Sequence, residues 1–148
     1  MRRRTYSLAK DCGGNSVIEF AFVAPLLCLL MIGMAQFGIT LNNYVNLTSA
    51  VGSGARNLAL SRGASTPYSS TTSLINSAAV NLTTASLTIT IRVNGTACST
   101  DTTCSTALTA AQGLTSTVSA TYPCNLTVMG RDYAPGCTLS SSTSERIE

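Results

Sequence analysis

The chain has 148 residues, a formal net charge of +3, no histidine and only 10% charged residues. Soluble domains usually have about 25% charged residues, and here uncharged polar residues fill the difference, which is typical of a surface outside the cytoplasm. The basic residues form no stripe interleaved with aromatic side chains, so nucleic acid is excluded as a predicted partner. Histidine, the usual general base of enzymes, is absent, and the carboxylates are few and scattered. We therefore expect neither an enzyme nor a cofactor.

Residues 1–14, MRRRTYSLAKDCGG, form a short basic leader without an apolar segment. The excess of Lys and Arg predicts that this end lies in the cytoplasm and that the C-terminal part lies outside. An ordinary secretory signal has an apolar segment of about 7–15 residues and then a cleavage site of small residues. The apolar run that follows here is longer, and Gln36-Phe37-Gly38 within it matches such a site poorly. We therefore do not expect ordinary signal-peptide cleavage.

An uncharged apolar run extends from Phe20 to Leu41, and Glu19 stands directly before it. A helix of about 22 residues covers about 33 Å, enough to cross a bilayer core of about 30 Å, so we predict a transmembrane segment over about residues 18–41. An ionisable group at the start of such a segment is costly, which makes Glu19 a candidate functional residue. The alternative is that Glu19 merely sits among the lipid headgroups. Cys28, inside the run, is expected to be a small buried hydrophobic side chain.

The basic leader that ends in Gly14, the apolar run, and a Glu five residues after that Gly resemble the processing site of type IV pilin-like proteins. Further residues are similar to the TadE-like branch, the minor pseudopilins of the tight-adherence (Flp-type) pilus. These residues are Val17 to Leu27, Gly33, Gln36-Phe37-Gly38, Ala50 and Gly54-Ala55-Arg56. Gln36 departs from the family pattern, which commonly has Glu there, and this affects a polar contact between helices rather than the processing site. The resemblance is specific over Gly14 to Arg62.

The resemblance implies that a prepilin peptidase cuts after Gly14 and makes Asn15 the new N-terminus. Glu19 would then pair with the α-amino group of Asn15 in a neighbouring subunit and set the axial register of assembly. The implied partners are the prepilin peptidase, other pilin and pseudopilin subunits, an inner-membrane pilus assembly platform and membrane lipid. The implied location is the bacterial inner membrane for the precursor, with the C-terminal domain in the periplasm, and the extracellular pilus after assembly.

Two other functions remain open at this point. The first is an uncleaved single-span membrane protein whose outer domain binds a ligand or partner. The second is a major pilin or a type II secretion pseudopilin with the same leader.

The helix is predicted to continue past the membrane and to run from about Val17 to Leu60, within a helical region at residues 15–62. Apolar residues recur there at three- and four-residue steps, which marks one helix face. Gly52 and Gly54 indicate either tight packing or a local break. Arg56 and Arg62 are expected to be solvated or to pair with the outer domain. The predicted face consists of Leu41, Tyr44, Thr48, Val51, Ala55 and Leu58, widened by Val45, Leu47 and Leu60.

Residues 63–148 are predicted to form a small α+β domain, with an antiparallel sheet packed on the long helix. The clearest strand is 86–93, where apolar residues alternate with Thr and Arg before an Asn94-Gly95 turn. A short helix capped by Thr72 or Ser73 should precede that strand. The other predicted elements are a helical turn or two at 106–112, a strand at 114–122 and a third strand at 137–142, with 128–133 ambiguous.

Cys98, Cys104, Cys124 and Cys137 all fall in the predicted outer domain. Disulfides are expected there, and the simplest of the possible connectivities joins Cys98 to Cys104 and Cys124 to Cys137. A metal site would need paired short spacings such as C-x-x-C, and the sequence has neither these nor histidine, so no metal is expected.

Overall fold

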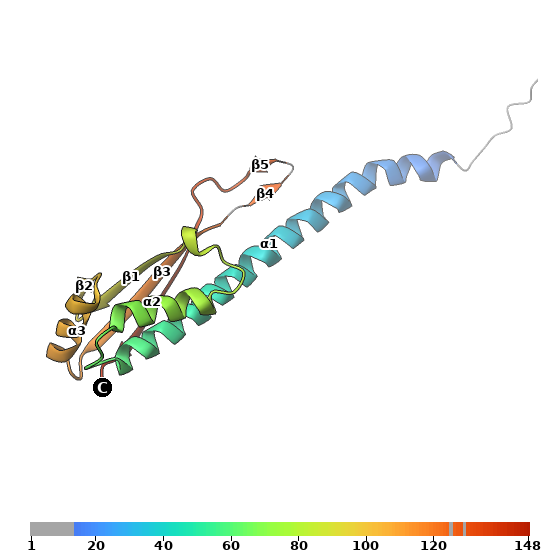
Figure 1. The fold of residues 1–148 in the computed structure, drawn as a ribbon. Helices are drawn as coiled ribbons and strands as arrows, with labels where there is room; N and C mark the ends of the chain where they lie inside the picture. Colours follow the sequence, from blue (N-terminus) through green and yellow to red (C-terminus); the bar gives the residue numbers. More distant parts are fainter. Residues whose placement is uncertain (1–13, 125, 129) are drawn as a thin grey trace, which may run out of the picture.

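The computed structural model describes residues 14–124, 126–128 and 130–148. A long N-terminal helix carries a small antiparallel domain on its C-terminal half (Figure 1). The predicted α+β fold is therefore confirmed. The helices are α1 (Gly14–Leu60), α2 (Pro67–Ala78) and α3 (Asp101–Ala110), with a single 3₁₀ turn at Thr84–Ser86. The strands are β1 (Thr88–Val93), β2 (Thr96–Cys98), β3 (Thr115–Pro123), β4 (Thr127–Val128), β5 (Arg131–Asp132) and β6 (Thr138–Arg146).

Helix α1 has 47 residues, so it is about 70 Å long. Pro25 lies inside it, and the helix continues through Gly52 and Gly54, so the local break considered from the sequence does not occur. The N-terminal half extends away from the domain, while the C-terminal half packs against α2, β3 and β6 (Figure 1). The two halves therefore have different surroundings.

The buried face of α1 differs from the predicted one. Leu47 is the first apolar residue of the helix to be buried, whereas Leu41, Tyr44 and Thr48 are exposed. Apart from the β4–β5 hairpin, which lies beside α1 without burying it, the domain covers the helix from Leu47 onward, and the covered face then follows three- and four-residue steps. It consists of Leu47, Ala50, Val51, Gly54, Ala55, Leu58 and Ala59.

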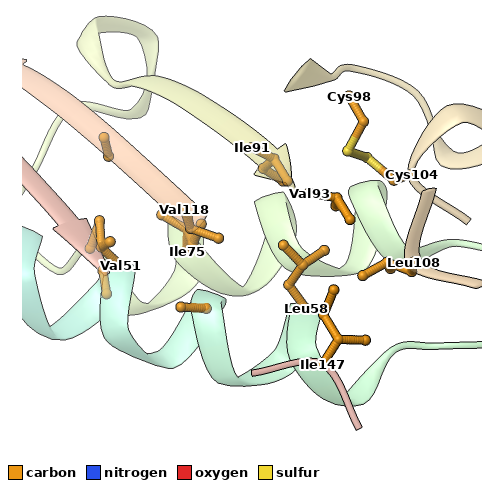
Figure 2. Close-up of a cluster of buried hydrophobic side chains, with 14 of the residues drawn as sticks. Val51, Leu58, Ile75, Ile91, Val93, Cys98, Cys104, Leu108, Val118 and Ile147 are labelled. Atoms are coloured by element: carbon orange, nitrogen blue, oxygen red, sulfur yellow. A yellow bond between two sulfur atoms is a disulfide. The ribbon is translucent and has the colours of Figure 1, made fainter. Parts of the chain in front are cut away.

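The main sheet has four antiparallel strands in the order β2-β1-β3-β6. In the register of this sheet, Ile91 of β1 lies opposite Val118 of β3, and Val118 lies opposite Thr143 of β6. The alternation of apolar and hydroxyl residues in β1 turns Ile91 and Val93 toward the helices and Thr90 toward solvent, as period-two patterning requires. The resulting core contains Leu58, Ile75, Leu108 and Ile147 as well (Figure 2).

Several predicted boundaries were wrong. Helix α2 begins at Pro67 instead of at a Thr72 or Ser73 cap, because a proline fits the first helical position, where its missing N–H is not needed. Helix α3 begins at Asp101 instead of 106, because Thr100 and Thr103 form a reciprocal capping box.

The last strand, β6, continues to Arg146, beyond the predicted end at 142. The C-terminal end of β6 is rich in Ser and Thr and lacks the alternation of apolar residues that predicts a strand. This end is a strand because it pairs with β3. Strand β2 was not predicted, and the ambiguous segment 128–133 contributes to the small β4–β5 hairpin.

Gly54 and Gly52 provide a matched pair for testing the packing of α1 on α2. A Cβ at Gly54 would lie 2.6 Å from Cδ1 of Ile75, whereas a Cβ at Gly52 meets nothing within 4 Å. Gly54→Ala should therefore destabilise the domain by about 1–3 kcal/mol. Gly52→Ala should stabilise it by up to about 1 kcal/mol through helix propensity. Thermal unfolding of the full chain in detergent, followed by circular dichroism, measures both, and equal effects would contradict the tight contact at Gly54.

Candidate functional site

The candidate processing and assembly residues lie together at the N-terminal end of α1. Gly14 is the first residue of the helix and Asn15 the second. Glu19 follows four residues after Asn15, which is about 6 Å along the axis, and its side chain is exposed. Side chains on a helix lean toward its N-terminus, so the Glu19 carboxylate is directed toward the Asn15 end of the helix. The remainder of the predicted leader, including Cys12, lies outside the described residues.

Glu19 has no cation beside it within the described part of the chain. The ion pair found there joins Arg56 to Glu145, with Nε 3.9 Å from Oε1, at the other end of α1. Arg56, which was expected to be solvated or to pair with the domain, thus pairs with Glu145 of the domain, and Arg62 is exposed to solvent. Glu19 is thus a carboxylate beside an apolar surface with no intramolecular ion pair among the described residues.

The N-terminal half of α1 exposes an apolar surface along its length. Within the described residues, α1 is the one helix long and apolar enough to cross a membrane, with a mean hydropathy of 2.4 over a window of which none is buried. Cys28, which was expected to be buried, is also exposed. The exposed large apolar residues are Val17, Ile18, Phe20, Phe22, Val23, Leu26, Leu27, Leu29, Leu30, Met31, Ile32, Met34, Phe37, Ile39 and Leu41.

The β4–β5 hairpin lies beside part of this apolar surface. Val128 of β4 and Tyr133, directly after β5, line a groove of about 350 Å³ together with Leu29 and Gly33 of α1. The described residues that line the groove are two aliphatic side chains, one aromatic side chain and a glycine, so the groove is largely apolar. The hairpin therefore approaches the apolar segment from one side and leaves the rest of it uncovered.

The predicted disulfide cysteines are paired as sequence neighbours. Cys98 at the end of β2 is joined to Cys104 in α3, and the sulfur bridge lies at the edge of the core (Figure 2). Cys124 is joined to Cys137 directly beyond the paired ends of β3 and β6, where the Cys124 N–H donates to the Cys137 carbonyl at 3.1 Å. The structure does not bring these cysteines near Glu19. Among the residues that the structure describes, no group of His, Cys, Asp or Glu is arranged to hold a metal ion.

Asp101 was not singled out from the sequence, yet it connects two helices. Its carboxylate accepts hydrogen bonds from the Ser69 hydroxyl at 2.5 Å and from the Ser69 backbone N–H at 2.8 Å, so it caps the start of α2 from the start of α3. These bonds, led by the hydroxyl bond, favour the charged carboxylate and lower the pKa of Asp101 below its ordinary value of 3.8. The sequence does show an Asp directly after Thr100 at the start of a helix. It does not show that Asp101 would bind Ser69, which lies 32 residues earlier in the chain.

The lowered pKa of Asp101 predicts a pH-dependent contribution to stability. Because the pKa is lower in the folded state than in the unfolded state, the contribution is present above the ordinary value of 3.8 and is lost as the pH falls through the folded value. Asp101→Ala should therefore lower the melting temperature at neutral pH, and the difference from wild type should shrink in acid below that value. Glu148→Gln, which removes an exposed carboxylate, is the control. A difference for Asp101→Ala that does not change with pH would contradict this assignment.

Comparison with known families identifies the element that carries these residues. A family model described as TadE-like protein matches residues 14–56. This stretch is a TadE-like segment. The resemblance predicted from the sequence is thereby confirmed over residues 14–56. The comparisons with curated proteins and with solved structures gave no match.

The TadE-like segment coincides with α1 except for the last turn of that helix. It contains Gly14, Asn15 and Glu19, the exposed apolar surface, and the beginning of the face that packs on the domain. The match suggests involvement in the tight-adherence pilus and contact with other pilus components, and the apolar helix fits anchoring in a membrane. The disulfide-containing domain lies outside the matched residues.

Proposed function

We propose that this protein is a minor pseudopilin that takes part in assembly of a tight-adherence type IV pilus after processing by a prepilin peptidase. The observation that carries the proposal is the TadE-like match over residues 14–56, on a helix that begins at Gly14 and exposes an apolar surface directly after Glu19. The role is structural and interactional.

Processing requires a peptide bond that an enzyme can reach at the membrane surface. Gly14 has no side chain, so the backbone on the N-terminal side of the cleaved bond can approach a peptidase closely. The position of Gly14 before the apolar segment supports cleavage between Gly14 and Asn15. Cleavage creates an α-amino group on Asn15, which the precursor does not have.

The new amine is the proposed partner of Glu19 in a neighbouring subunit. A carboxylate at the start of an apolar segment is poorly solvated, and a nearby ammonium group offsets that cost if the two come within hydrogen-bond distance. The side chain of Glu19 is exposed at the start of the apolar segment, so a group of a neighbouring subunit can reach it. Such a pair would fix the axial position of one subunit relative to the next.

The exposed apolar surface supports two successive environments for α1. In the precursor the segment from about residue 18 to 41 spans the inner membrane, because a helix of this length matches the bilayer core. In that state the β4–β5 hairpin, which contains the charged residues Arg131 and Asp132, lies away from Leu29 and Gly33. In the pilus the same surface packs against helices of other pilin and pseudopilin subunits. The disulfide-containing domain lies on the periplasmic side before assembly and on the outside of the pilus afterwards.

The identity of the first residue tests this proposal against an uncleaved single-span membrane protein. Protein extracted from membranes of cells with an active prepilin peptidase should begin at Asn15, and protein from peptidase-deficient cells should begin at Met1. An intact Met1 in both strains would reject the pseudopilin function. The amount of the protein in sheared pili then separates a minor subunit from a major pilin, because a major pilin would dominate that fraction.

A further inference from the structure

The outer face of the main sheet, the side away from α1, consists almost entirely of hydroxyl side chains. Strand alternation places on this face Thr88, Thr90 and Arg92 of β1, Ala97 of β2, Thr115, Thr117, Ser119, Thr121 and Pro123 of β3, and Thr138, Ser140, Ser142, Ser144 and Arg146 of β6. We call these residues the hydroxyl face. It has no carboxylate and no large apolar side chain.

The hydroxyl groups at the centre of this face are paired across the strands. Thr117 Oγ1 lies 2.8 Å from Ser144 Oγ, and Ser119 Oγ lies 3.0 Å from Ser142 Oγ. Each hydroxyl has one donor and two acceptor lone pairs, so a bonded pair keeps a donor and several acceptors available for a ligand. Short side chains that are already ordered lose little conformational entropy on binding. The centre is therefore a prearranged set of donors and acceptors.

Arg92 gives the hydroxyl face its positive charge. It lies in the same cross-strand row as Thr117 and Ser144. Its Nη1 donates to the Gly95 carbonyl at 3.2 Å, which orients the guanidinium and leaves its other N–H donors available. Among the described residues, Arg92 forms no ion pair and its side chain is exposed.

Arg146 contributes less to this charge. It lies at the end of β6 and lines a cavity with a second arginine, Arg56, and two carboxylates, Glu145 and Glu148. Glu145 itself alternates to the opposite face of the sheet, where it contacts Arg56. Arg146 therefore lies among other charged side chains at the end of the sheet, whereas Arg92 lies in the row of the paired hydroxyl groups.

We propose that the hydroxyl face binds an acidic polysaccharide. Its hydroxyl groups would donate hydrogen bonds to, and accept them from, the hydroxyl groups of the sugars. Arg92 would bind a sugar carboxylate through the planar array of N–H donors of its guanidinium group. The face has no apolar centre for an ordinary protein partner and no aromatic side chain on which a nucleobase could stack. A second copy bound face to face would bring like charges together. Charge complementarity thus favours a polymer that is both acidic and rich in hydroxyl groups.

The test uses the full chain in detergent micelles and immobilised polygalacturonate, with binding followed by biolayer interferometry. Saturable binding is expected, and it should weaken as salt screens the charge of Arg92. Arg92→Gln should weaken binding about fivefold, the upper range for one exposed charged pair. The double variant Ser119→Ala/Ser142→Ala should also weaken it about fivefold, since it removes a hydroxyl pair without leaving one partner behind.

The controls separate charge, hydroxyl groups and folding. Arg62→Gln removes an exposed arginine away from the sheet, and Ser73→Ala removes an exposed hydroxyl of α2, so both should bind like wild type. All variants should melt at the wild-type temperature. Neutral dextran should bind weakly because it has no charge, and polyglutamate because it has no hydroxyl groups. Absence of saturable wild-type binding, equal binding of either control polymer, or an unchanged affinity for Arg92→Gln would overturn the proposal.

Discussion

Gly14→Phe is expected to leave the protein uncleaved in the inner membrane and to abolish its incorporation into pili. The aromatic side chain would occupy space that the peptidase needs to approach the backbone before Asn15. Without cleavage, the α-amino group of Asn15 does not form, so the proposed partner of Glu19 is missing as well. Mass spectrometry of the membrane-extracted protein should show Met1 or the unprocessed leader in place of Asn15 as the N-terminus.

A graded series makes this prediction more specific. Gly14→Ala adds a single methyl group and should reduce cleavage less than Gly14→Phe does, while Gly13→Ala, one position earlier, serves as the matched control. Efficient cleavage of Gly14→Phe between residues 14 and 15 would contradict the steric argument. Normal pili made by an uncleaved protein would contradict the need for processing.

Glu19→Ala should separate the two steps that Gly14→Phe blocks together, leaving cleavage nearly intact while assembly is impaired. The residue lies beyond the cleaved bond, so the peptidase substrate is preserved. Removing one member of a buried ion pair costs about 3–5 kcal/mol, because the other charge is left without a partner. If the Asn15 amine of a neighbour is that partner, incorporation of the variant should fall by roughly a hundredfold or more.

A second variant at this position distinguishes charge from shape, and a variant at Glu145 serves as the control. Glu19→Gln keeps the size and the hydrogen-bonding capacity but loses the charge, so it should be nearly as defective as Glu19→Ala. Glu145→Gln removes a carboxylate from a surface ion pair, which is worth at most about 1 kcal/mol, and should assemble normally. The measurements are the N-terminal residue of the membrane form and the amount of protein in sheared pili. Normal incorporation of Glu19→Gln would show that the charge is not used.

The N-terminal helix could be predicted from the sequence because its signals are local. An uninterrupted apolar run of membrane length, a carboxylate at its start and a glycine before it are all readable within a few tens of residues. The strand at β1 was recognisable for the same reason, since its alternation of apolar and hydroxyl residues has a period of two. Local turn chemistry at Asn94-Gly95 marked its end, where both residues have positive φ angles.

The misplaced starts of α2 and α3 depend on local signals, Pro67 and the Thr100–Thr103 capping box, whereas the other misplaced boundaries depend on partners that are distant in the chain. The polar end of β6 is a strand because β3 pairs with it, and the covered part of α1 begins at Leu47 because that is where the domain makes contact. Asp101 became recognisable as the cap of α2 only when the fold placed Ser69 beside it. No local pattern predicts which distant segment will supply a pairing partner.

The sequence by itself determined the class of fold, the exposed apolar helix and the position of Gly14, Asn15 and Glu19 at its start, because each depends on residues that are close in the chain. Tertiary structure decided which face of α1 the domain covers and which cysteines are joined. It also decided that hydroxyl groups from three strands meet with Arg92 on one surface that has no carboxylate. The physical reason is that strand register and packing bring together residues whose separation in the chain carries no information about their distance in space.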